Sequence, residues 1–456
     1  MEQLHTIAAV ATPRGEGGIS IIRISGSQAL PILKKVFRPI KRNCRFSSRR
    51  LYLGHVLTED GNRLDQVLAV YMRGPGTYTG EDVVEIHAHG GLFVTKEVLR
   101  LVLQAGATMA EPGEFTQRAF LSGKLDLVQA EAVIDLIRAS ASAAARQAER
   151  HLEGELSRLV RDIKQRVLQL LAEVVATVDF PDDDLPDVDI SSMSAVLSQL
   201  ETELQQLLST SFAGKVLRDG IRVVIAGKPN VGKSSLLNAL VGREKAIVTE
   251  YAGTTRDIVE ELVVIGGVPV RLMDTAGLHA ARDPVEQIGV DRAERAMAEA
   301  DLLLVVLDNS SSLTEEDQRV LRLAAGRPHL IVLNKGDLEG CDHPELVLSR
   351  AQGVPLTVSA ATGAGLGLLR STIVQQVIGK QSLEESLLVA NARQEQALRR
   401  AAEFLRDAKH TLDNGLPLDL VTVDLEEALR ELGSVLGEAV DEAVIEDIFS
   451  RFCIGK

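Results

Sequence analysis

The sequence predicts a multidomain protein in which an α/β domain with a largely parallel sheet is inserted between two helical segments, after a β-rich N-terminal third. Three observations predict this organisation. Apolar strand runs alternate with helical patterns from about residue 218 to 378. Amphipathic helical patterns flank that region over residues 125–209 and 383–452. Short strand-like runs and turns fill residues 1–120.

The bulk composition is typical of a globular protein with about three domains, since the chain has 456 residues, 45% hydrophobic and 25% charged. No apolar run approaches the length of about 18 residues that a membrane span needs, and no signal peptide is recognisable. Three scattered cysteines (Cys44, Cys341 and Cys453) do not form a disulfide framework, so we expect a cytoplasmic protein. A net charge of −14 and the absence of Trp argue against a generic nucleic-acid coat and against a base-stacking platform.

Three strands are expected in the N-terminal third, at residues 19–24, 67–71 and 83–86. Glu85, His87 and His89 alternate and would face one side of the last strand. They could form a metal site, or the polar edge of a pocket with hydrogen-bonded histidines.

The segment 34–50 carries eight basic residues and no acidic one, which is a local departure in an acidic chain: Lys34, Lys35, Arg38, Lys41, Arg42, Arg45, Arg49 and Arg50. It could bind an RNA backbone or a partner. Alternatively, it is a solvated helix end and loop.

The helical middle begins near Leu125, where apolar residues start to recur at spacings of three to four. An acidic break with two prolines, at residues 179–187, ends the helical pattern. That break could hold a metal, although a solvated loop is the plainer interpretation. A further helix, roughly over residues 193–209, leads through Gly214 to the next strand.

The inserted domain opens with a phosphate-binding signature. Residues 227–234 read Gly-Lys-Pro-Asn-Val-Gly-Lys-Ser, between the strand run 223–226 and a helical run, and fit G-x-x-x-x-G-K-[ST]. Lys233 would neutralise the β- and γ-phosphates, and the hydroxyl of Ser234 would bind Mg²⁺. The residues expected to touch the nucleotide here are Asn230, Val231, Gly232, Lys233, Ser234 and Ser235.

Four further motifs follow in the order found in a GTPase. The first switch, at Thr249, Glu250, Tyr251, Ala252, Gly253, Thr254 and Thr255, would bring Thr255 to the Mg²⁺. Asp274-Thr275-Ala276-Gly277 follows a strand, where Asp274 would support the Mg²⁺ and Gly277 would sense the γ-phosphate. Asp337, in Asn334-Lys335-Gly336-Asp337, can accept N1–H and the 2-amine of guanine, groups that adenine does not offer, and Ser359-Ala360 would pack on the base. The five motifs together predict GTP rather than ATP.

Leu278 follows the Asp-Thr-Ala-Gly motif, where small Ras-like GTPases carry a Gln that orients the attacking water. A leucine cannot do this, so another residue must. Glu286 is the best local candidate for this catalytic role, beside the plainer interpretation of a surface glutamate.

The whole chain resembles the MnmE (TrmE) family of tRNA-modification GTPases. The residues that carry the resemblance are Ala11-Thr12-Pro13 with Arg23-Ile24-Ser25-Gly26, Tyr78-Thr79-Gly80-Glu81-Asp82, Pro112-Gly113-Glu114-Phe115, Phe180-Pro181, Gly253-Thr254-Thr255-Arg256-Asp257 and the terminal Phe452-Cys453-Ile454-Gly455-Lys456. The resemblance implies an α+β domain over residues 1–120 that binds folate and dimerises. It also implies a helical domain from residues 121–217 and 379–456, with a Ras-like P-loop GTPase domain over residues 218–378 inserted into it.

The resemblance also implies the ligands. A 5-formyl-tetrahydrofolate-type one-carbon donor would contact Arg23, Glu85, Lys124 and Lys456. In place of an arginine finger, a K⁺ ion held by Asn230, Thr249, Tyr251 and Thr254 would stabilise the charge that develops during hydrolysis. Lys233, Asn230 and the water-positioning Glu286 are thus the expected catalytic residues, and the nucleotide domains of a homodimer would close on each other.

The implied reaction is modification of carbon 5 of the wobble uridine (position 34) of tRNAs to a (carboxymethyl)aminomethyl form. An FAD-containing partner of the MnmG (GidA) type would complete the enzyme, in a heterotetramer or larger complex. Cys453 could have a thiol role, or the tail could act only through its shape and the charge of Lys456. Two alternatives stay open, a ribosome-docking regulatory GTPase without modification activity and a folate-dependent one-carbon enzyme in which GTP is only structural.

Overall fold

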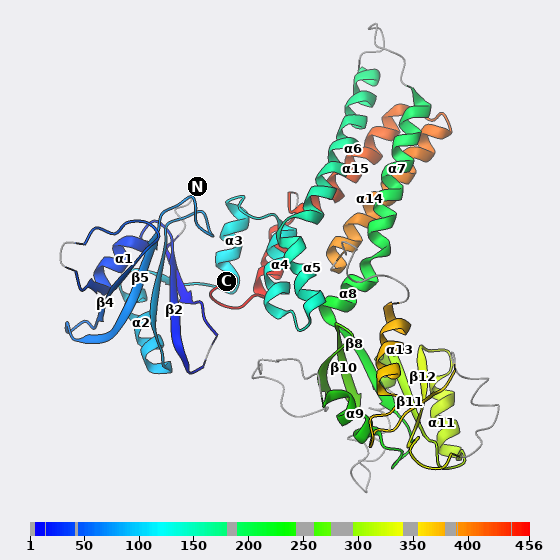
Figure 1. The fold of residues 1–456 in the computed structure, drawn as a ribbon. Coiled ribbons are helices and arrows are strands. Elements are labelled where there is room, and N and C mark those ends of the chain that lie inside the picture. The colour runs from blue at the N-terminus through cyan, green and yellow to red at the C-terminus, as the bar shows by residue number, and fades with distance from the viewer. Residues whose placement is uncertain are drawn as a thin grey trace. The chain divides into compact units, whose positions relative to one another are not determined.

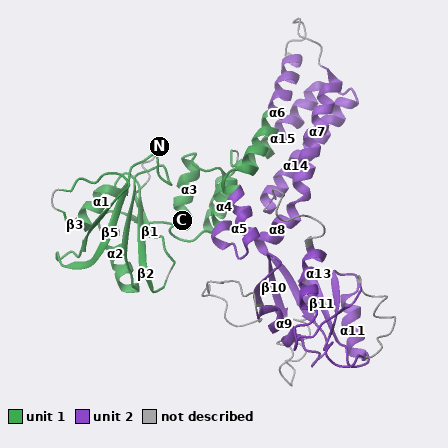
Figure 2. Ribbon diagram, viewed as in Figure 1, with its two compact units in different colours: residues 1–134, 151–165, 429–456 green, residues 135–150, 166–428 purple. Residues whose placement is uncertain are grey.

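The structure is a computed structural model of the chain, and it describes residues 5–13, 15–41, 44–179, 189–242, 260–274, 295–340, 354–378, 389, 391–438 and 440–456. The chain forms two compact units (Figure 2). Unit 1 comprises residues 1–134, 151–165 and 429–456, and unit 2 comprises residues 135–150 and 166–428. The last residues of the chain therefore belong with the first.

Unit 1 is built on a seven-stranded sheet with the order β3-β4-β5-β6-β2-β1-β7 (Figure 1). Its strands are β1 (Ile7–Val10), β2 (Gly17–Ser25), β3 (Phe37–Pro39), β4 (Arg50–Leu57), β5 (Arg63–Met72), β6 (Val83–Gly90) and β7 (Thr108–Met109). All neighbours are antiparallel except β1 and β7. The three strands expected from the sequence are confirmed as parts of β2, β5 and β6.

Two helices, α1 (Ala29–Val36) and α2 (Leu92–Gln104), contact this sheet and bury its core. Ile22, Ile24 and Ile86 supply fully buried side chains from the central strands. The alternation of each strand leaves its other residues, including Arg23 and Glu85, on the opposite face. That face carries the polar groups of one candidate site.

Helices α3 (Glu114–Leu121) and α4 (Leu127–Arg138) come directly after the sheet in the chain, and α16 (Glu442–Ser450) is the last helix before the C-terminus. Phe449 and Phe452 are buried in a cluster with Ala130 and Ile134 of α4. Gly113 has a φ of 72°, and a Cβ there would lie 2.5 Å from the carbonyl oxygen of Phe449. This close approach of two backbones, more than 300 residues apart in the sequence, requires glycine.

The remaining long helices are α5 (Ser142–Leu152), α6 (Glu155–Asp179), α7 (Ile190–Ser209), α8 (Ser211–Asp219), α14 (Ala392–Asp413) and α15 (Leu418–Leu436). Helix α7 starts at Asp189, whose side chain accepts the amides of Ser191 and Ser192, and it packs on α14. Helix α8 was not predicted, since the residues around Gly214 were expected only to connect the helix over residues 193–209 to the next strand, yet Gly214 is buried within a helix. The acidic break at residues 179–187 lies, except for Asp179, outside the described residues.

The nucleotide domain has a six-stranded sheet with the order β13-β12-β11-β8-β10-β9. The strands are β8 (Ile221–Ala226), β9 (Glu260–Ile265), β10 (Val268–Asp274), β11 (Leu302–Asp308), β12 (His329–Asn334) and β13 (Leu356–Thr357). All pairs are parallel except β9 with β10, which confirms the largely parallel sheet. Helices α9 (Lys233–Val241), α11 (Glu315–Ala324) and α13 (Leu366–Ile378) join the apolar clusters of this sheet.

One burial prediction is wrong. The apolar runs at residues 302–307, 330–333 and 356–358 each predict a strand buried on both faces, but in the last of them only Val358 is buried, whereas Leu356 is half-buried and Thr357 is exposed. The reason is that β13 is the edge strand of the sheet. None of the described helices is both long and apolar enough to cross a membrane.

Candidate functional site

The phosphate loop lies between β8 and α9, as its sequence predicts. Gly232 has a φ of 92° and precedes the first residue of α9. A Cβ at Gly232 would lie 2.3 Å from Nδ2 of Asn334, so only glycine fits there. Asn230 also has a positive φ, of 65°, and is exposed. The loop is therefore shaped by backbone conformations that few residues adopt.

Lys233 is 4% exposed, and its ammonium group lies inside the loop. Its Nζ donates to the carbonyl oxygens of Gly227 at 2.8 Å and Lys228 at 2.9 Å. Because these acceptors are neutral, an anionic phosphate oxygen would be a stronger partner for the same ammonium group. This arrangement fits the phosphate-neutralising role expected of Lys233.

A second lysine of the phosphate loop, Lys228, forms an ion pair with a residue outside the loop. The ammonium group of Lys228 lies 2.7 Å from Oδ2 of Asp317, whose side chain is only 2% exposed. Asp317 and Thr314 form the capping box at the start of α11, and the Thr314 amide donates to the same carboxylate oxygen at 2.9 Å. The start of the phosphate loop is thus tied to the start of α11. Asp317 was not predicted from the sequence, although Thr-x-x-Asp before an apolar pattern is a readable capping signal.

The base-recognition motif is joined to the phosphate loop through Asn334. Its Nδ2 donates to the carbonyl oxygen of Val231 at 2.9 Å, and its Oδ1 accepts the amide of Ala360 at 3.1 Å. Lys335 has a φ of 63°, and its Nζ lies 2.6 Å from Oδ2 of Asp308. Burial alone would raise the pKa of Asp308, but hydrogen bonds from Lys335 and Ser310 outweigh it and lower that pKa. Asp308 was not predicted from the sequence, although it ends a buried strand.

Asp337 presents an exposed carboxylate that is fixed on one side. The hydroxyl of Ser359 donates to its Oδ1 at 2.6 Å and itself accepts the amide of Thr362 at 3.1 Å. A carboxylate held in this way can receive two parallel N–H groups from one edge of a base. The structure thus brings together Asn334, Lys335, Asp337, Ser359 and Ala360, as the sequence predicts.

Several predicted residues fall outside the described part of the chain, namely Thr249, Glu250, Tyr251, Ala252, Gly253, Thr254, Thr255, Thr275, Ala276, Gly277 and Glu286. Asp274 is described only as the last residue of β10, opposite Ile225 in the register with β8. Its backbone therefore lies at the edge of the sheet from which the phosphate loop departs. Ser234 and Ser235 are exposed at the start of α9.

A second group of polar residues lies on the open face of the sheet in unit 1. Arg23 and Glu85 are opposite each other on β2 and β6, and Nε of Arg23 donates to Oε1 of Glu85 at 3.0 Å. Nε2 of His87 lies 3.2 Å from Oε2 of the same carboxylate. The Arg23 guanidinium also lies over the ring of Phe115, 5.8 Å from its centroid.

The C-terminal tail docks at this group. The amide of Phe115, in the first turn of α3, donates to the carbonyl oxygen of Lys456 at 3.2 Å, and Ile454 forms a β-bridge with Pro112. Nη1 of Arg23 lies 3.4 Å from the carbonyl oxygen of Gly455. Arg23 therefore connects the carboxylate of Glu85 with the last residues of the chain.

Burial lowers the pKa of Lys456, and the positive charge of Arg23 lowers it further. Nearby, burial raises the pKa of Tyr78, whose hydroxyl is 2.9 Å from that of Thr116. A half-buried ammonium group beside a guanidinium favours an anionic ligand, since a negative charge would relieve the repulsion. Arg23, Glu85 and Lys456 are thus brought together as expected.

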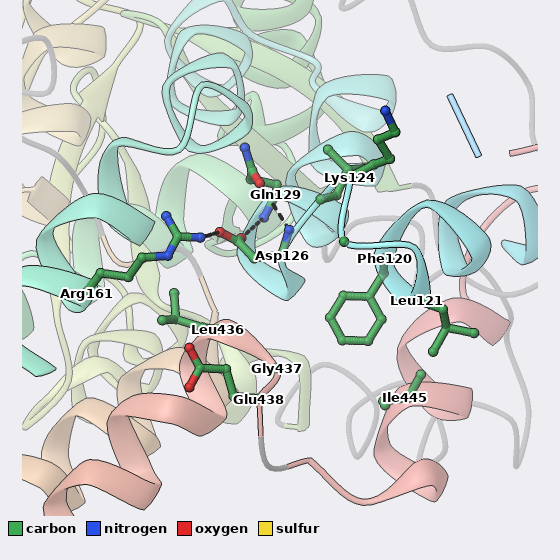
Figure 3. A pocket seen from close by; sticks show the side chains of 12 residues that line it. Phe120, Leu121, Lys124, Asp126, Gln129, Arg161, Leu436, Gly437, Glu438 and Ile445 are labelled. Atoms are coloured by element: carbon green, nitrogen blue, oxygen red, sulfur yellow. Dashed lines mark hydrogen bonds and ion pairs between the residues drawn. The ribbon is translucent and has the colours of Figure 1, made fainter. Parts of the chain in front are cut away.

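Lys124 lies against the turn that follows Tyr78, since its Cε would be 3.8 Å from a Cβ on Gly80. Within the described structure it makes no hydrogen bond or ion pair with Arg23, Glu85 or Lys456; it lines a pocket of about 520 Å³. Figure 3 shows Arg161 pointing at Asp126 on one side of this pocket, where Nη2 and Oδ2 are 2.6 Å apart. The other lining residues are Phe120, Leu121, Gly123, Leu125, Gln129, Leu436, Gly437, Glu438 and Ile445. The grouping of Lys124 with the other folate contacts stays a prediction.

The histidines of β6 follow the hydrogen-bonded interpretation. His89 is held by Asp65, with Nδ1 and Oδ1 2.6 Å apart, whereas His87 contacts Glu85. In the described ranges, no group of three His, Cys, Asp or Glu side chains could hold a metal ion. Cys453 is exposed.

Comparison with known proteins places the chain in a family. A family model described as the MnmE helical domain matches residues 127–453, and one described as the N-terminus of the GTP-binding protein TrmE matches residues 6–124. The tRNA modification GTPase MnmE of Symbiobacterium thermophilum is 48% identical to the chain and covers 99% of both sequences. The protein of the same name from Lactiplantibacillus plantarum is 44% identical and covers 100% of this chain and 99% of its own length.

Among solved structures, Era of Aquifex aeolicus bound to GDP and aluminium fluoride is 26% identical, with a TM-score of 0.29, and covers 40% of this chain and 66% of its own. The family assignment depends on the sequence relatives and on the two family models. These matches, together with the motifs for phosphate and guanine, confirm the predicted fold class: an α+β N-terminal domain, a helical domain and an inserted α/β P-loop GTPase domain. The chain therefore belongs to the MnmE (TrmE) family of tRNA modification GTPases, and it is a GTP hydrolase that acts in tRNA modification.

Proposed function

We propose that the chain is a potassium-activated GTPase that, with an FAD-containing partner of the MnmG (GidA) type, modifies carbon 5 of the wobble uridine (position 34) of tRNAs. The product would be a (carboxymethyl)aminomethyluridine, and the carbon donor a folate of the 5-formyl-tetrahydrofolate type. The observation that carries this proposal is the presence of two separate sites in one chain. One is suited to a guanine nucleotide, and the other joins Arg23, Glu85 and the C-terminal Lys456.

In the nucleotide site, Lys233 would bind the β- and γ-phosphates, while Ser234 and Thr255 would hold Mg²⁺. The exposed Asp337 carboxylate, oriented by Ser359, would select guanine. The substitution Asp337→Asn should convert this preference, because an amide can donate to the C2 carbonyl of xanthine. We expect the Asp337→Asn variant to lose GTP hydrolysis and gain XTP hydrolysis. Equal rates of GTP hydrolysis in the wild type and the variant would contradict the role of Asp337 in selecting guanine.

Asn230 is the described residue proposed to bind K⁺, with Thr249, Tyr251 and Thr254 as further ligands. Its exposed position and its φ of 65° at the tip of the loop support this role. Potassium would supply positive charge beside the phosphates, and Glu286 would position the attacking water. We expect faster GTP hydrolysis in KCl than in NaCl at equal ionic strength, with the difference lost in Asn230→Ala. Equal rates in the two salts would rule out the proposal.

The folate site is supported by its donors and acceptors. Arg23 and Lys456 provide positive charge for carboxylates. Glu85 can accept from an aminopyrimidine edge through Oε2, which has His87 beside it, whereas Nε and Nη2 of Arg23 both lie 3.0 Å from Oε1. Lys124 is included in the proposal, although in the described structure it lines the pocket of Figure 3. Titration calorimetry with 5-formyl-tetrahydrofolate tests the site. Unchanged affinity in Arg23→Met and Glu85→Gln would exclude it.

For the assembly, we propose a homodimer formed through the N-terminal domain, which joins the MnmG-type partner and tRNA in a heterotetramer or larger complex in the cytoplasm. The proposed domain layout is 1–120 for folate binding and dimerisation, 121–217 and 379–456 for the helical domain, and 218–378 for the GTPase domain.

A ribosome-docking regulatory GTPase is the alternative function, and an enzyme that uses folate with GTP only as a structural ligand is a weaker one. The Arg23–Glu85 site and the docked tail favour modification, since a docking GTPase has no need of them. The decisive measurement is mass spectrometry of wobble uridines in tRNA from cells that lack the protein. Unaltered uridines would refute the main proposal.

A further inference from the structure

The basic residues of segment 34–50 form one exposed surface of unit 1. Its six main members are Lys34, Arg38, Lys41, Arg45, Arg49 and Arg50, and all six are exposed. We call this surface the basic edge. It follows the end of α1, the short strand β3 and the start of β4, which lie beside one another in Figures 1 and 2.

Strand register explains why these residues share a surface. Strand β3 is the outermost strand of the sheet, and Arg38 is opposite His55 of β4. Nη1 of Arg38 donates to the carbonyl oxygen of Lys34 at 2.6 Å, which fixes the Arg38 guanidinium group at the C-terminal end of α1. The pairing continues past β3, because the amide of Ile40 donates to the carbonyl oxygen of Leu53 at 3.0 Å. From His55 to Arg50, β4 extends about 17 Å at a rise of about 3.4 Å per residue.

Tyr52 holds the second half of the basic edge in place. Its hydroxyl donates to the carbonyl oxygen of Arg45 at 3.0 Å, and its ring packs edge-on against Phe46. The guanidinium group of Arg50 lies over the same ring, 6.0 Å from the centroid. Arg49 donates to the carbonyl oxygen of Gly76. The chain is thus folded so that its aromatic rings point inward and its cations point to solvent.

The cations of the basic edge have no carboxylate partners in the described structure, and their hydrogen bonds go to backbone carbonyl groups. Several other arginines of unit 1 are paired with a carboxylate, as in Arg23–Glu85, Arg118–Glu81 and Arg161–Asp126. A chain with a net charge of −14 has ample carboxylates to neutralise these six groups. Leaving them unpaired on one edge concentrates positive potential there.

We propose that the basic edge binds the phosphate backbone of the tRNA; this inference rests on the proposed function. Closely spaced cations along an extended edge fit a regular row of phosphates. A protein partner would require buried aromatic or apolar anchors. Tyr52 is 9% exposed and is not such an anchor, whereas the apolar side chains of Ile40, Leu51 and Leu53 are exposed beside the cations. The charge of the basic edge therefore carries the inference, and a protein partner is the alternative occupant that the test must exclude. The same inward packing of aromatic rings leaves no platform for bases, so the contact is independent of sequence.

The test is a triple neutralisation that leaves the packing intact. Lys34→Gln, Lys41→Gln and Arg45→Gln remove three charges whose side chains hold nothing else in the described structure. The matched control, Arg63→Gln with Lys96→Gln and Arg158→Gln, removes three exposed cations from other parts of unit 1. The triple variant and the control variant have the same net charge as each other. Both should hydrolyse GTP at the wild-type rate in the absence of tRNA.

Binding of a fluorescent, unmodified tRNA transcript is measured by anisotropy between 50 and 200 mM KCl. Each phosphate contact contributes a slope of about −0.7 to −0.9 in log K against log salt, so the triple variant should flatten the slope by about 2. Its affinity at 50 mM salt should fall at least about tenfold. The control should follow the wild-type curve, and tRNAs of different sequence should lose affinity equally.

Any one of the following results would overturn the inference: a wild-type protein that does not bind tRNA at low salt, a triple variant with an unchanged slope, or an equal loss in the control. If the triple variant loses binding to a protein partner but keeps its tRNA curve, the basic edge is a protein-docking surface, and the inference is also wrong. Failure of the proposed function is recognised separately. It would show as unaltered wobble uridines in tRNA from cells that lack the protein, whatever the result of the binding measurement.

Discussion

Replacing Gly455 with alanine should detach the C-terminal tail while the rest of unit 1 stays folded. Gly455 has a φ of 95°, which a residue with a Cβ rarely adopts. Its Cβ would lie 2.2 Å from the carbonyl oxygen of Val10 and 3.1 Å from Cα of Ala11. Val10 ends β1 opposite Ile22 of β2, and the amide of the next residue, Ala11, donates to the carbonyl oxygen of Ile21 at 2.8 Å, so these backbone atoms are held by the neighbouring strand.

Whether the tail stays docked depends on the cost of alanine at position 455 compared with the free energy of the contacts that hold the tail. A non-glycine residue at this φ costs about 1–3 kcal/mol, before the overlap with Val10 is counted. The tail is held by the Phe115–Lys456 bond, the Ile454–Pro112 bridge and the long Arg23–Gly455 contact. At about 1 kcal/mol each, these sum to about 3 kcal/mol. The overlap with backbone atoms adds about 1–3 kcal/mol of its own. The total of about 2–6 kcal/mol is comparable to this sum or exceeds it, so the tail should leave its site.

The assay is amide hydrogen exchange at Phe115, whose N–H donates to the tail and lies in the first turn of α3, where it has no helical acceptor. In Gly455→Ala we expect its protection to fall to that of an open amide, with little change in the thermal midpoint. Gly91→Ala, in the same unit and with nothing within 4 Å of the added Cβ, is the control. Retained protection at Phe115 in Gly455→Ala would show that the overlap relaxes and that our reasoning is wrong.

Three further predictions follow from the same contacts. Lys228→Met should leave the buried Asp317 carboxylate without its cation and destabilise the nucleotide domain by about 3 kcal/mol, whereas Lys228→Arg should keep most of the stability, as urea unfolding can measure. The pKa of Lys456 is lower in the docked tail than in a free tail, so the free tail binds more protons between the two pKa values. Docking of the tail should therefore strengthen as the pH rises toward the ordinary lysine pKa. It should weaken as the pH falls through the pKa that Lys456 has in the docked tail. Hydrogen exchange at the Phe115 amide across that range should show this trend, and a flat profile in wild type, or an unchanged one in Lys456→Met, would contradict it. Cys453→Ser should leave the tail docked, because the turn is made by backbone groups and Gly455; lost wobble-uridine modification with a docked tail would show that the thiol takes part in the chemistry.

The nucleotide domain was the part most readily predicted from sequence. Its central strands are buried on both faces, so they appear as uninterrupted apolar runs, and its ligand residues follow the strand ends in short motifs. The prediction failed where the position in the sheet, rather than local sequence, decides burial, as at Leu356 and Thr357 on the edge strand. Helix α8 was missed because Gly214 is locally unfavourable in a helix but is buried there, where a small residue can pack closely.

Contacts between distant parts of the chain were the least predictable. The resemblance placed Arg23, Glu85 and Lys456 in one site, but no local pattern shows that Gly455 must approach Val10 or that Gly113 must approach Phe449. The pair Lys228–Asp317 joins residues that are 89 positions apart. In the sequence, each of these residues alone is indistinguishable from an ordinary charged residue on the surface. Such pairings depend on tertiary packing, which a single sequence does not display.

The last four residues therefore have separate tasks, although they read as one motif. The amide of Lys456 donates to the carbonyl oxygen of Cys453 at 3.3 Å, so the tail ends in a tight turn that needs Gly455 at its positive φ. This turn leaves Cys453 exposed and brings Lys456 half-buried beside Arg23. Because backbone bonds fix the turn, the position of the Lys456 ammonium group depends on Gly455 and not on the thiol. The geometry thus favours a tail that acts by placing a charge, and any thiol chemistry must take place on its exposed side.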